Sequence, residues 1–150
     1  MGGNSPILYD NAFLTQLTFK QANDFLNGIP FNTLLGVRLL RFHADGVTIG
    51  CTVREELRNG AGVLHGGVAA TLADVSVGVA VTRHLGRPRA ATTVEMKINY
   101  LRPVKDGKVT ARSHLVRVGK NLCTARVDVF NGSKEPAAVA LVTYMILGEK

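Results

Sequence analysis

A long apolar segment dominates the middle of the chain: residues 65–83 read HGGVAATLADVSVGVAVTR. At 100° per residue, the larger apolar side chains fall on one side of a helix and the smallest residues fall on the other. The predicted core face carries Val68, Leu72, Val75 and Val79. The opposite face carries Gly67, Ala70, Thr71, Asp74 and Gly78. Solvated helix faces normally carry long charged side chains, so these small residues predict close contact with another backbone or with a ligand.

Segments on both sides of this helix have the alternation and turn residues of strands. A capping box at Thr18 predicts a short helix that ends near Asn27. The predicted strands cover residues 36–43, 47–54, 92–101, 109–118, 122–130 and 137–147. A hairpin, one long helix and an antiparallel meander indicate an α+β fold in which the sheet covers the helix. We expect residues 1–150 to form a single domain, with residues 1–15 as a loosely held lead-in.

The start of the predicted helix and its carboxylate have the chemistry of an acyl-transfer site. Free amides and partial positive charge at a helix N-terminus suit an oxyanion, and Gly66 lets a carbonyl group approach without a Cβ in the way. Asp74 can then act as a nucleophile or as a general base on water. Structural explanations stay open beside these: a paired or solvated carboxylate at Asp74, a cap at His65, and tight packing or positive φ at the two glycines.

The spacing of Gly66 and Asp74 sets a geometric condition on such a site. Eight positions separate them, which is about 12 Å along a helix, whereas a general base must lie within about 3 Å of the proton it takes. Asp74 therefore cannot serve the helix start of its own chain. Two antiparallel copies related by a two-fold axis would bring Asp74 of one chain to Gly66 of the other, so the spacing predicts a homodimer with shared sites.

Composition and charge restrict the class of protein and its partners. The 150 residues are 46% hydrophobic and carry a formal net charge of +7, which fits a folded domain that attracts polyanions. The basic residues are scattered and the few aromatic residues are not interleaved with them, so we expect a ligand with several phosphates rather than nucleic acid. Cys51 and Cys123 lie in alternating apolar segments without ligand residues at metal spacing, so we expect buried free thiols and no metal site.

Signals of export and membrane insertion are missing from the residues at hand. Residues 1–10 show no basic region followed by an apolar run, and no apolar stretch reaches the roughly 18 residues of a membrane span. We therefore expect a cytoplasmic location and no membrane partner.

The residues in and around the helix resemble the PaaI-like thioesterases of the hotdog superfamily, which includes 4-hydroxybenzoyl-CoA thioesterase. The matching residues are Asn59, His65-Gly66-Gly67, Asp74, residues 93–100, Arg102-Pro103 and residues 119–122. The resemblance covers approximately residues 30–147. It implies a hotdog fold, in which an antiparallel sheet wraps around a long central helix. It also implies an acyl-CoA thioesterase that assembles as homodimers and further as homotetramers.

The resemblance implies roles for individual residues as well. Asp74 would be the nucleophile or base, and the Gly66 amide would polarise the thioester carbonyl. Asn59 and His65 would position the thioester or the water. Thr93, where the family commonly has serine, would hydrogen-bond the attacking water. Coenzyme A would enter as part of the substrate, with no separate cofactor.

Contacts with coenzyme A are expected from the helix start and from bases that flank the matching strands. The residues assigned to it are Gly67, Arg102, Lys105, Arg117 and Lys120. Arg87 and Arg89, which follow the helix, are weaker candidates. Each base has an ordinary solvated residue as its alternative interpretation.

Two other functions of the same fold stay open at this point. A hotdog dehydratase or hydratase needs a histidine and an acidic residue together at the reacting carbons, whereas His65 precedes the helix. A non-catalytic acyl-CoA-binding sensor usually needs an output domain, which we do not expect within these 150 residues. Both arguments favour hydrolysis of an acyl- or aroyl-CoA to the free acid and coenzyme A.

Overall fold

A computed structural model describes residues 17–86 and 91–147 of the chain. Its elements, in order, are α1 (Phe19–Asn27), α2 (Pro30–Leu35), β1 (Arg38–His43), β2 (Gly46–Thr52), the 3-10 helix η1 (Glu55–Leu57), α3 (Gly66–His84), β3 (Ala91–Tyr100), β4 (Lys108–Val118), β5 (Leu122–Phe130) and β6 (Ala138–Ile146). The lead-in expected over residues 1–15 and the candidate bases Arg87 and Arg89 lie outside the described residues.

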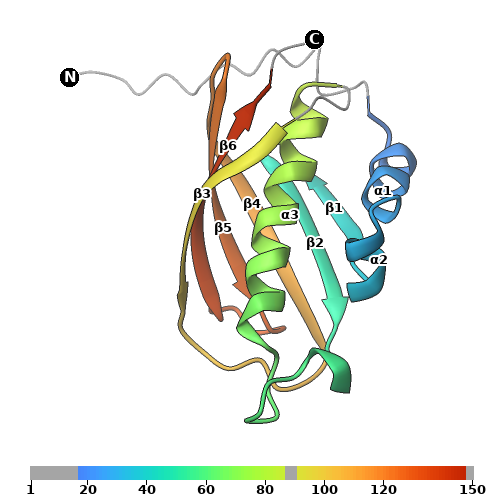
Figure 1. Cartoon of the computed structure of the whole chain (residues 1–150), viewed down its shortest axis with the longest axis vertical. Coiled ribbons are helices and arrows are strands. Elements are labelled where there is room, and N and C mark those ends of the chain that lie inside the picture. Colours follow the sequence, from blue (N-terminus) through green and yellow to red (C-terminus); the bar gives the residue numbers. More distant parts are fainter. Residues whose placement is uncertain (1–16, 87–90, 148–150) are drawn as a thin grey trace, which may run out of the picture.

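The six strands form one antiparallel sheet in the order β1-β2-β4-β5-β6-β3. The long helix α3 lies along one face of this sheet and contacts β2, β4 and β5 most extensively (Figure 1). The short helix α1 packs against β1 at one edge, while β3 forms the opposite edge. An antiparallel sheet wrapped around a long central helix is the α+β hotdog fold that the sequence predicts, and the structure confirms it.

Capping residues explain where the first helices begin and end. The Thr18 hydroxyl accepts from the Gln21 N–H at 3.2 Å, and the Gln21 side chain accepts from the Thr18 N–H at 2.9 Å, which completes the predicted capping box. α1 ends at Asn27, as expected. Pro30 lies just beyond the predicted end of this helix and begins α2, because the first position of a helix needs no N–H donor. α2 and η1 were not predicted.

The central helix α3 buries more than the single face that its periodicity predicts. Besides Val68, Leu72 and Val79, its buried residues are Ala69, Ala73, Ser76, Val77, Ala80, Val81 and Thr82. The curved sheet encloses the helix on several sides, and a helix in such a place is apolar nearly all round. Val75, which the pattern assigns to the core face, is only partly buried: it packs against the core and also lines a cavity together with Asp74 and Gly78.

The register of the sheet aligns one row of residues beneath α3. Val118 of β4 pairs with Cys123 of β5, Cys123 pairs with Tyr144 of β6, and Tyr144 pairs with Thr93 of β3. The far end of β3 is aligned in the same way, because Tyr100 pairs with Ala138. The two ends of β3 therefore belong to opposite ends of the sheet.

A β-bulge decides which way Thr93 faces. The register of β3 against β6 shifts between Thr93 and Glu95, so Val94 is the extra residue. Strict alternation from the inward-facing Met96 would turn Thr93 to the outer face of the sheet. The bulge turns it inward instead, toward α3. It also explains why Val94, which the alternating pattern places with Met96, is 48% exposed.

Both cysteines are buried free thiols, as expected, and burial raises the pKa of Cys123 to about 11. Among residues 17–86 and 91–147, no helix has the length and apolarity to cross a membrane.

Candidate active site

Asp74 lies in the middle of α3, on the partly exposed face of small residues. Its Oδ1 accepts a hydrogen bond from the Thr93 hydroxyl at 2.7 Å and a second from the Tyr144 hydroxyl at 2.9 Å. Within the described ranges Asp74 forms no ion pair, and its Oδ2 has no hydrogen-bond partner. The carboxylate is therefore held through one oxygen and has the other oxygen uncommitted.

Tyr144 is the residue of this group that the sequence analysis missed. Its hydroxyl donates to the main-chain oxygen of Asp74, at 3.0 Å, as well as to the carboxylate. Tyr144 is buried, and burial, reinforced by the nearby Asp74 charge, raises the pKa of its hydroxyl, so the hydroxyl stays a donor. A Cβ on Gly78 would lie 3.2 Å from the Tyr144 oxygen. The glycine one turn after Asp74 therefore makes room for this tyrosine.

Among the residues that the structure describes, the start of α3 has one backbone amide without a partner. His65 is the N-cap, and its Nδ1 accepts from the Gly67 N–H at 2.9 Å, while its carbonyl oxygen accepts from the Val68 N–H at 2.9 Å. The Gly66 N–H donates to no atom of the described residues. The cap at His65, which was one of the structural explanations left open, is present. Gly67, assigned to coenzyme A from the sequence, has its amide engaged in this cap.

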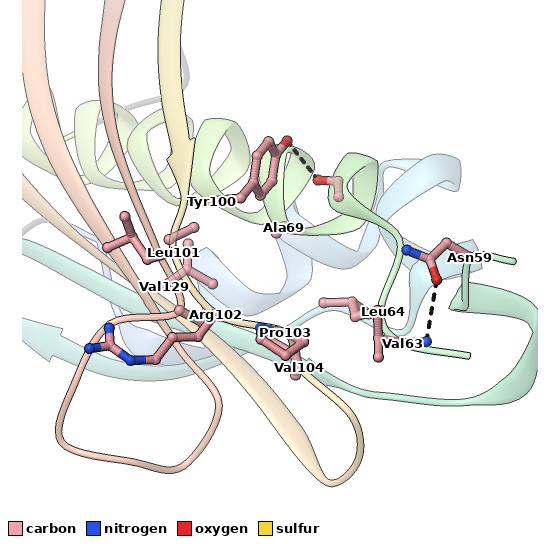
Figure 2. A pocket seen from close by; sticks show the side chains of 13 residues that line it. Asn59, Val63, Leu64, Ala69, Tyr100, Leu101, Arg102, Pro103, Val104 and Val129 are labelled. Carbon is pink, nitrogen blue, oxygen red and sulfur yellow. Dashed lines mark hydrogen bonds between the residues drawn. The ribbon is translucent and has the colours of Figure 1, made fainter. Parts of the chain in front are cut away.

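Tyr100 from the end of β3 covers the same helix start. Its hydroxyl donates to the Gly66 carbonyl oxygen at 3.0 Å, as the dashed line near Tyr100 in Figure 2 shows. A Cβ on Gly66 would lie 3.2 Å from the Tyr100 ring. Because any side chain at this position would press on the ring, Gly66 is needed for close packing, although its φ is not positive.

Asn59 holds the loop that leads into α3. Its Oδ1 accepts from the Ala61 N–H at 2.9 Å and from the Val63 N–H at 3.3 Å. Its side-chain nitrogen points away from this turn, toward a cavity of about 350 Å³ that Gly66, Ala69 and Tyr100 also line (Figure 2). The structure thus brings Asn59 and Gly66 to one cavity.

Arg58 connects this loop to a neighbouring segment of the chain. Its guanidinium donates to the carbonyl oxygens of Gly62 and Lys105, each at 2.6 Å, and pairs with Asp106 at 2.8 Å. The loop before α3 is thereby tied to the β3–β4 connection. Asn59 is positioned by backbone contacts on both sides, which favours a preorganised site.

The predicted site residues fall into two groups, one around Asp74 and one at the start of α3. Asp74 lines a cavity of about 300 Å³ beside α1 and α2, and Thr93 contacts Asp74. Asn59 and Gly66 belong to the other cavity, at the helix start. Neither cavity contains members of both groups, which agrees with the separation of about 12 Å that the helix rise gives.

The bases assigned to coenzyme A are divided between the two ends of the sheet. Arg102 and Lys105 follow Tyr100 and lie near the start of α3, whereas Arg117 and Lys120 adjoin the Val118–Cys123 pair in the Thr93 row. Arg102 is paired with Glu135 at 2.6 Å and donates to the Pro136 oxygen at 2.8 Å. One chain therefore does not gather the four bases into one patch.

Comparisons with known proteins identify the family of the chain. The model of the thioesterase superfamily matches residues 61–138. The medium/long-chain acyl-CoA thioesterase YigI of Escherichia coli K12 is 31% identical over 137 residues, which cover 81% of this chain and 88% of that protein. These names support hydrolysis over the dehydratase and sensor alternatives.

Solved structures show the same architecture. A thioesterase from Haemophilus influenzae superposes with a TM-score of 0.81 at 26% identity, covering 88% of this chain and 92% of that one. The fold is also that of PaaI from the phenylacetic acid degradation operon of E. coli, with a TM-score of 0.78 at 21% identity, covering 87% of this chain and 94% of that one. The chain belongs to the thioesterase superfamily and is a hotdog-fold, PaaI-like thioester hydrolase.

Proposed function

We propose that the protein hydrolyses acyl-CoA thioesters to the free acid and coenzyme A, with Asp74 as the reacting carboxylate. The name of the E. coli relative supports coenzyme A as the carrier. The observation that carries the proposal is the hydrogen bonding of the Asp74 carboxylate. Two hydroxyls hold its Oδ1, and its Oδ2 is uncommitted among the described residues. Such a carboxylate is oriented for reaction without being neutralised by a base.

Two chemical routes are open to Asp74. As a general base, Oδ2 takes a proton from water, whose oxygen attacks the thioester carbonyl carbon; the C–S bond then breaks and the thiolate of coenzyme A leaves. As a nucleophile, Oδ2 attacks that carbon itself, the thiolate leaves, and water hydrolyses the resulting anhydride. Thr93 and Tyr144 orient the carboxylate in both routes. The Thr93 oxygen is still able to accept a hydrogen bond from the attacking water.

The start of α3 supplies the complementary half of the reaction. The Gly66 N–H, at the positive end of the helix, donates to the thioester oxygen as negative charge develops on it. Asn59 directs its side-chain N–H groups into the same cavity, where they position the thioester. His65 accepts at Nδ1, so a neutral His65 carries its proton on Nε2 and is a further donor.

One two-fold axis joins the two halves across subunits. β3 pairs only with β6 in the described chain, which leaves its outer edge open. Antiparallel pairing of β3 with its copy, centred on Lys97 and with Val94 as the bulged residue, sets Thr93 opposite the partner's Tyr100. Since Thr93 contacts Asp74 and Tyr100 contacts Gly66, this pairing places complementary half-sites side by side.

The same two-fold axis is compatible with the positions of Gly66 and Asp74 on α3. Ala70 lies midway between Gly66 and Asp74, on the small-residue face of α3. A two-fold that passes near Ala70 brings Asp74 to the partner's Gly66, and small residues permit the close approach of two helices. We therefore propose a homodimer with shared sites. The homotetramer and the cytoplasmic location stay predictions.

The test is a thiol-release assay with a panel of acyl-CoA substrates. Asp74→Asn keeps the size of the side chain but removes the base, so kcat falls by about 10²- to 10⁴-fold. Asp24→Asn is the matched control, because Asp24 is an exposed residue of α1 that pairs with Lys20. An Asp74→Asn protein that hydrolyses at the wild-type rate would refute the proposal.

A further inference from the structure

The cavity beside Asp74 has an apolar wall that the reaction itself does not require. Its volume is about 300 Å³, and it is bounded by α1, α2, α3 and the first residue of β3. The apolar side chains that line it are Phe25, Leu26, Ile29, Phe31, Val75, Val79 and Ala91. Asp74 and Tyr144 line it as well, so the proposed reacting carboxylate borders an apolar space.

We propose that this cavity binds the aliphatic acyl chain of the substrate, with the thioester carbonyl at Asp74 and the chain directed toward α1 and α2. The inference rests on the proposed function, because it needs Asp74 to be the reacting group. Two polar residues of the lining are already engaged. Asn32 donates to the Leu26 oxygen at 3.0 Å, and Tyr144 donates to Asp74. A saturated chain is therefore a better occupant than a group with polar substituents.

The volume sets the length of chain that fits. A cavity of about 150 Å³ lined by apolar side chains accommodates one benzene ring. At the same packing, the space beside Asp74 holds about twice that, or about twelve carbon atoms. A single aryl group would leave roughly half of the space empty. The cavity therefore fits a medium-length acyl chain better than an aryl or a very short one.

The outer wall of the cavity is incomplete, which limits the length of acyl chain that the cavity can enclose. Phe25, Ile29 and Phe31 line the cavity and are nevertheless 36%, 40% and 54% exposed. Their exposed edges mark the limit of the enclosed space. Methylene groups beyond this limit remain in water and add little binding energy.

The experiment measures binding separately from hydrolysis. S-alkyl-CoA thioethers lack the carbonyl group and cannot be hydrolysed. Since coenzyme A is common to all of them, the change in affinity across chains of four, eight, twelve and sixteen carbons, measured by calorimetry, reports on the cavity. For the wild-type protein, the affinity rises by up to about fourfold per methylene and levels off near twelve carbons. An affinity that does not depend on chain length would overturn the inference.

Two variants locate the effect in this cavity. Val75→Phe fills the space with roughly four more carbon atoms, so the levelling-off moves to a chain shorter by about four carbons. Phe31→Ala removes part of the wall and lowers the affinity for the twelve-carbon thioether. Val116→Phe is the matched control, because Val116 is exposed on β4 and does not line the cavity. Length profiles unchanged in both cavity variants would also overturn the inference.

The outcome for the cavity is distinguishable from the outcome for the reaction. If the thioethers bind with the expected length profile but no acyl-CoA is hydrolysed, the proposed function fails and the chain subsite stands. If acyl-CoA is hydrolysed but the affinity for the thioethers depends neither on chain length nor on the cavity substitutions, the proposed function stands and the chain subsite fails.

Discussion

Replacing Tyr144 with phenylalanine removes one hydroxyl from beside the reacting carboxylate and changes little else. The ring stays in its buried place against Gly78. One bifurcated hydrogen bond is lost, because the single hydroxyl proton is shared between Asp74 Oδ1 at 2.9 Å and the Asp74 main-chain oxygen at 3.0 Å. Thr93 remains bonded to the same carboxylate oxygen at 2.7 Å. The substitution therefore loosens the carboxylate without freeing it.

The expected magnitude follows from the strength of a hydrogen bond to a charged group, about 1.5–3 kcal/mol. If most of this energy orients Asp74 in the transition state, kcat falls by about 10- to 100-fold. KM for butyryl-CoA stays nearly unchanged, because the phenylalanine ring keeps the apolar surface that Tyr144 presents to the cavity. The free energy of unfolding falls by about 1–2 kcal/mol.

The assay combines thiol release from butyryl-CoA with urea denaturation of the same protein. Thr93→Val and the double variant complete a thermodynamic cycle. Because both hydroxyls hold one oxygen, their effects on kcat are not additive. A Tyr144→Phe protein with the wild-type kcat, or with a raised KM and an unchanged kcat, would show that Tyr144 does not position Asp74.

Two further perturbations test the surroundings of the site and the pH dependence of stability. Gly78→Ala places a Cβ 3.2 Å from the Tyr144 oxygen, so we expect kcat to fall several-fold. The better helix propensity of alanine keeps the free energy of unfolding within about 1 kcal/mol of wild type. An unchanged kcat would contradict this expectation. Burial, followed by the charges of Arg112 and Arg41, lowers the pKa of His43, so the unfolded chain binds more protons and stability declines as pH falls from about 7 toward 5. Urea denaturation across this range should show a flatter decline for His43→Gln; an equally steep one would refute the assignment.

The strongest local patterns were enough to predict the framework. The apolar run from residue 65 to 83 corresponds to α3, Gly66–His84, and the small residues opposite its core face do remain partly exposed. The predicted strands match the observed ones with small shifts at their ends, and β5 spans Leu122–Phe130 as predicted. Periodicity and turn residues are local features, so they can be recognised from the sequence.

The contacts that complete the candidate site depend on pairing between distant residues. Tyr144 is one inward-facing residue among several on β6, and only its pairing with Thr93 places it beside Asp74. The bulge at Val94, which turns Thr93 inward, leaves no mark in the alternating pattern of β3. The opposite placement of Arg102 and Arg117 likewise follows from register. Rules based on the local spacing of residues cannot predict the register between distant strands.

The central claim is that Asp74 of one subunit works with Gly66 of the other. Asp74→Ala and Gly66→Val proteins are each expected to be inactive; the valine lacks room because even a Cβ at Gly66 lies 3.2 Å from the Tyr100 ring. After subunit exchange in an equimolar mixture, each heterodimer has one intact shared site, so thiol release returns to about one quarter of the wild-type rate. No recovery, with heterodimers demonstrated by native mass spectrometry, would contradict the account.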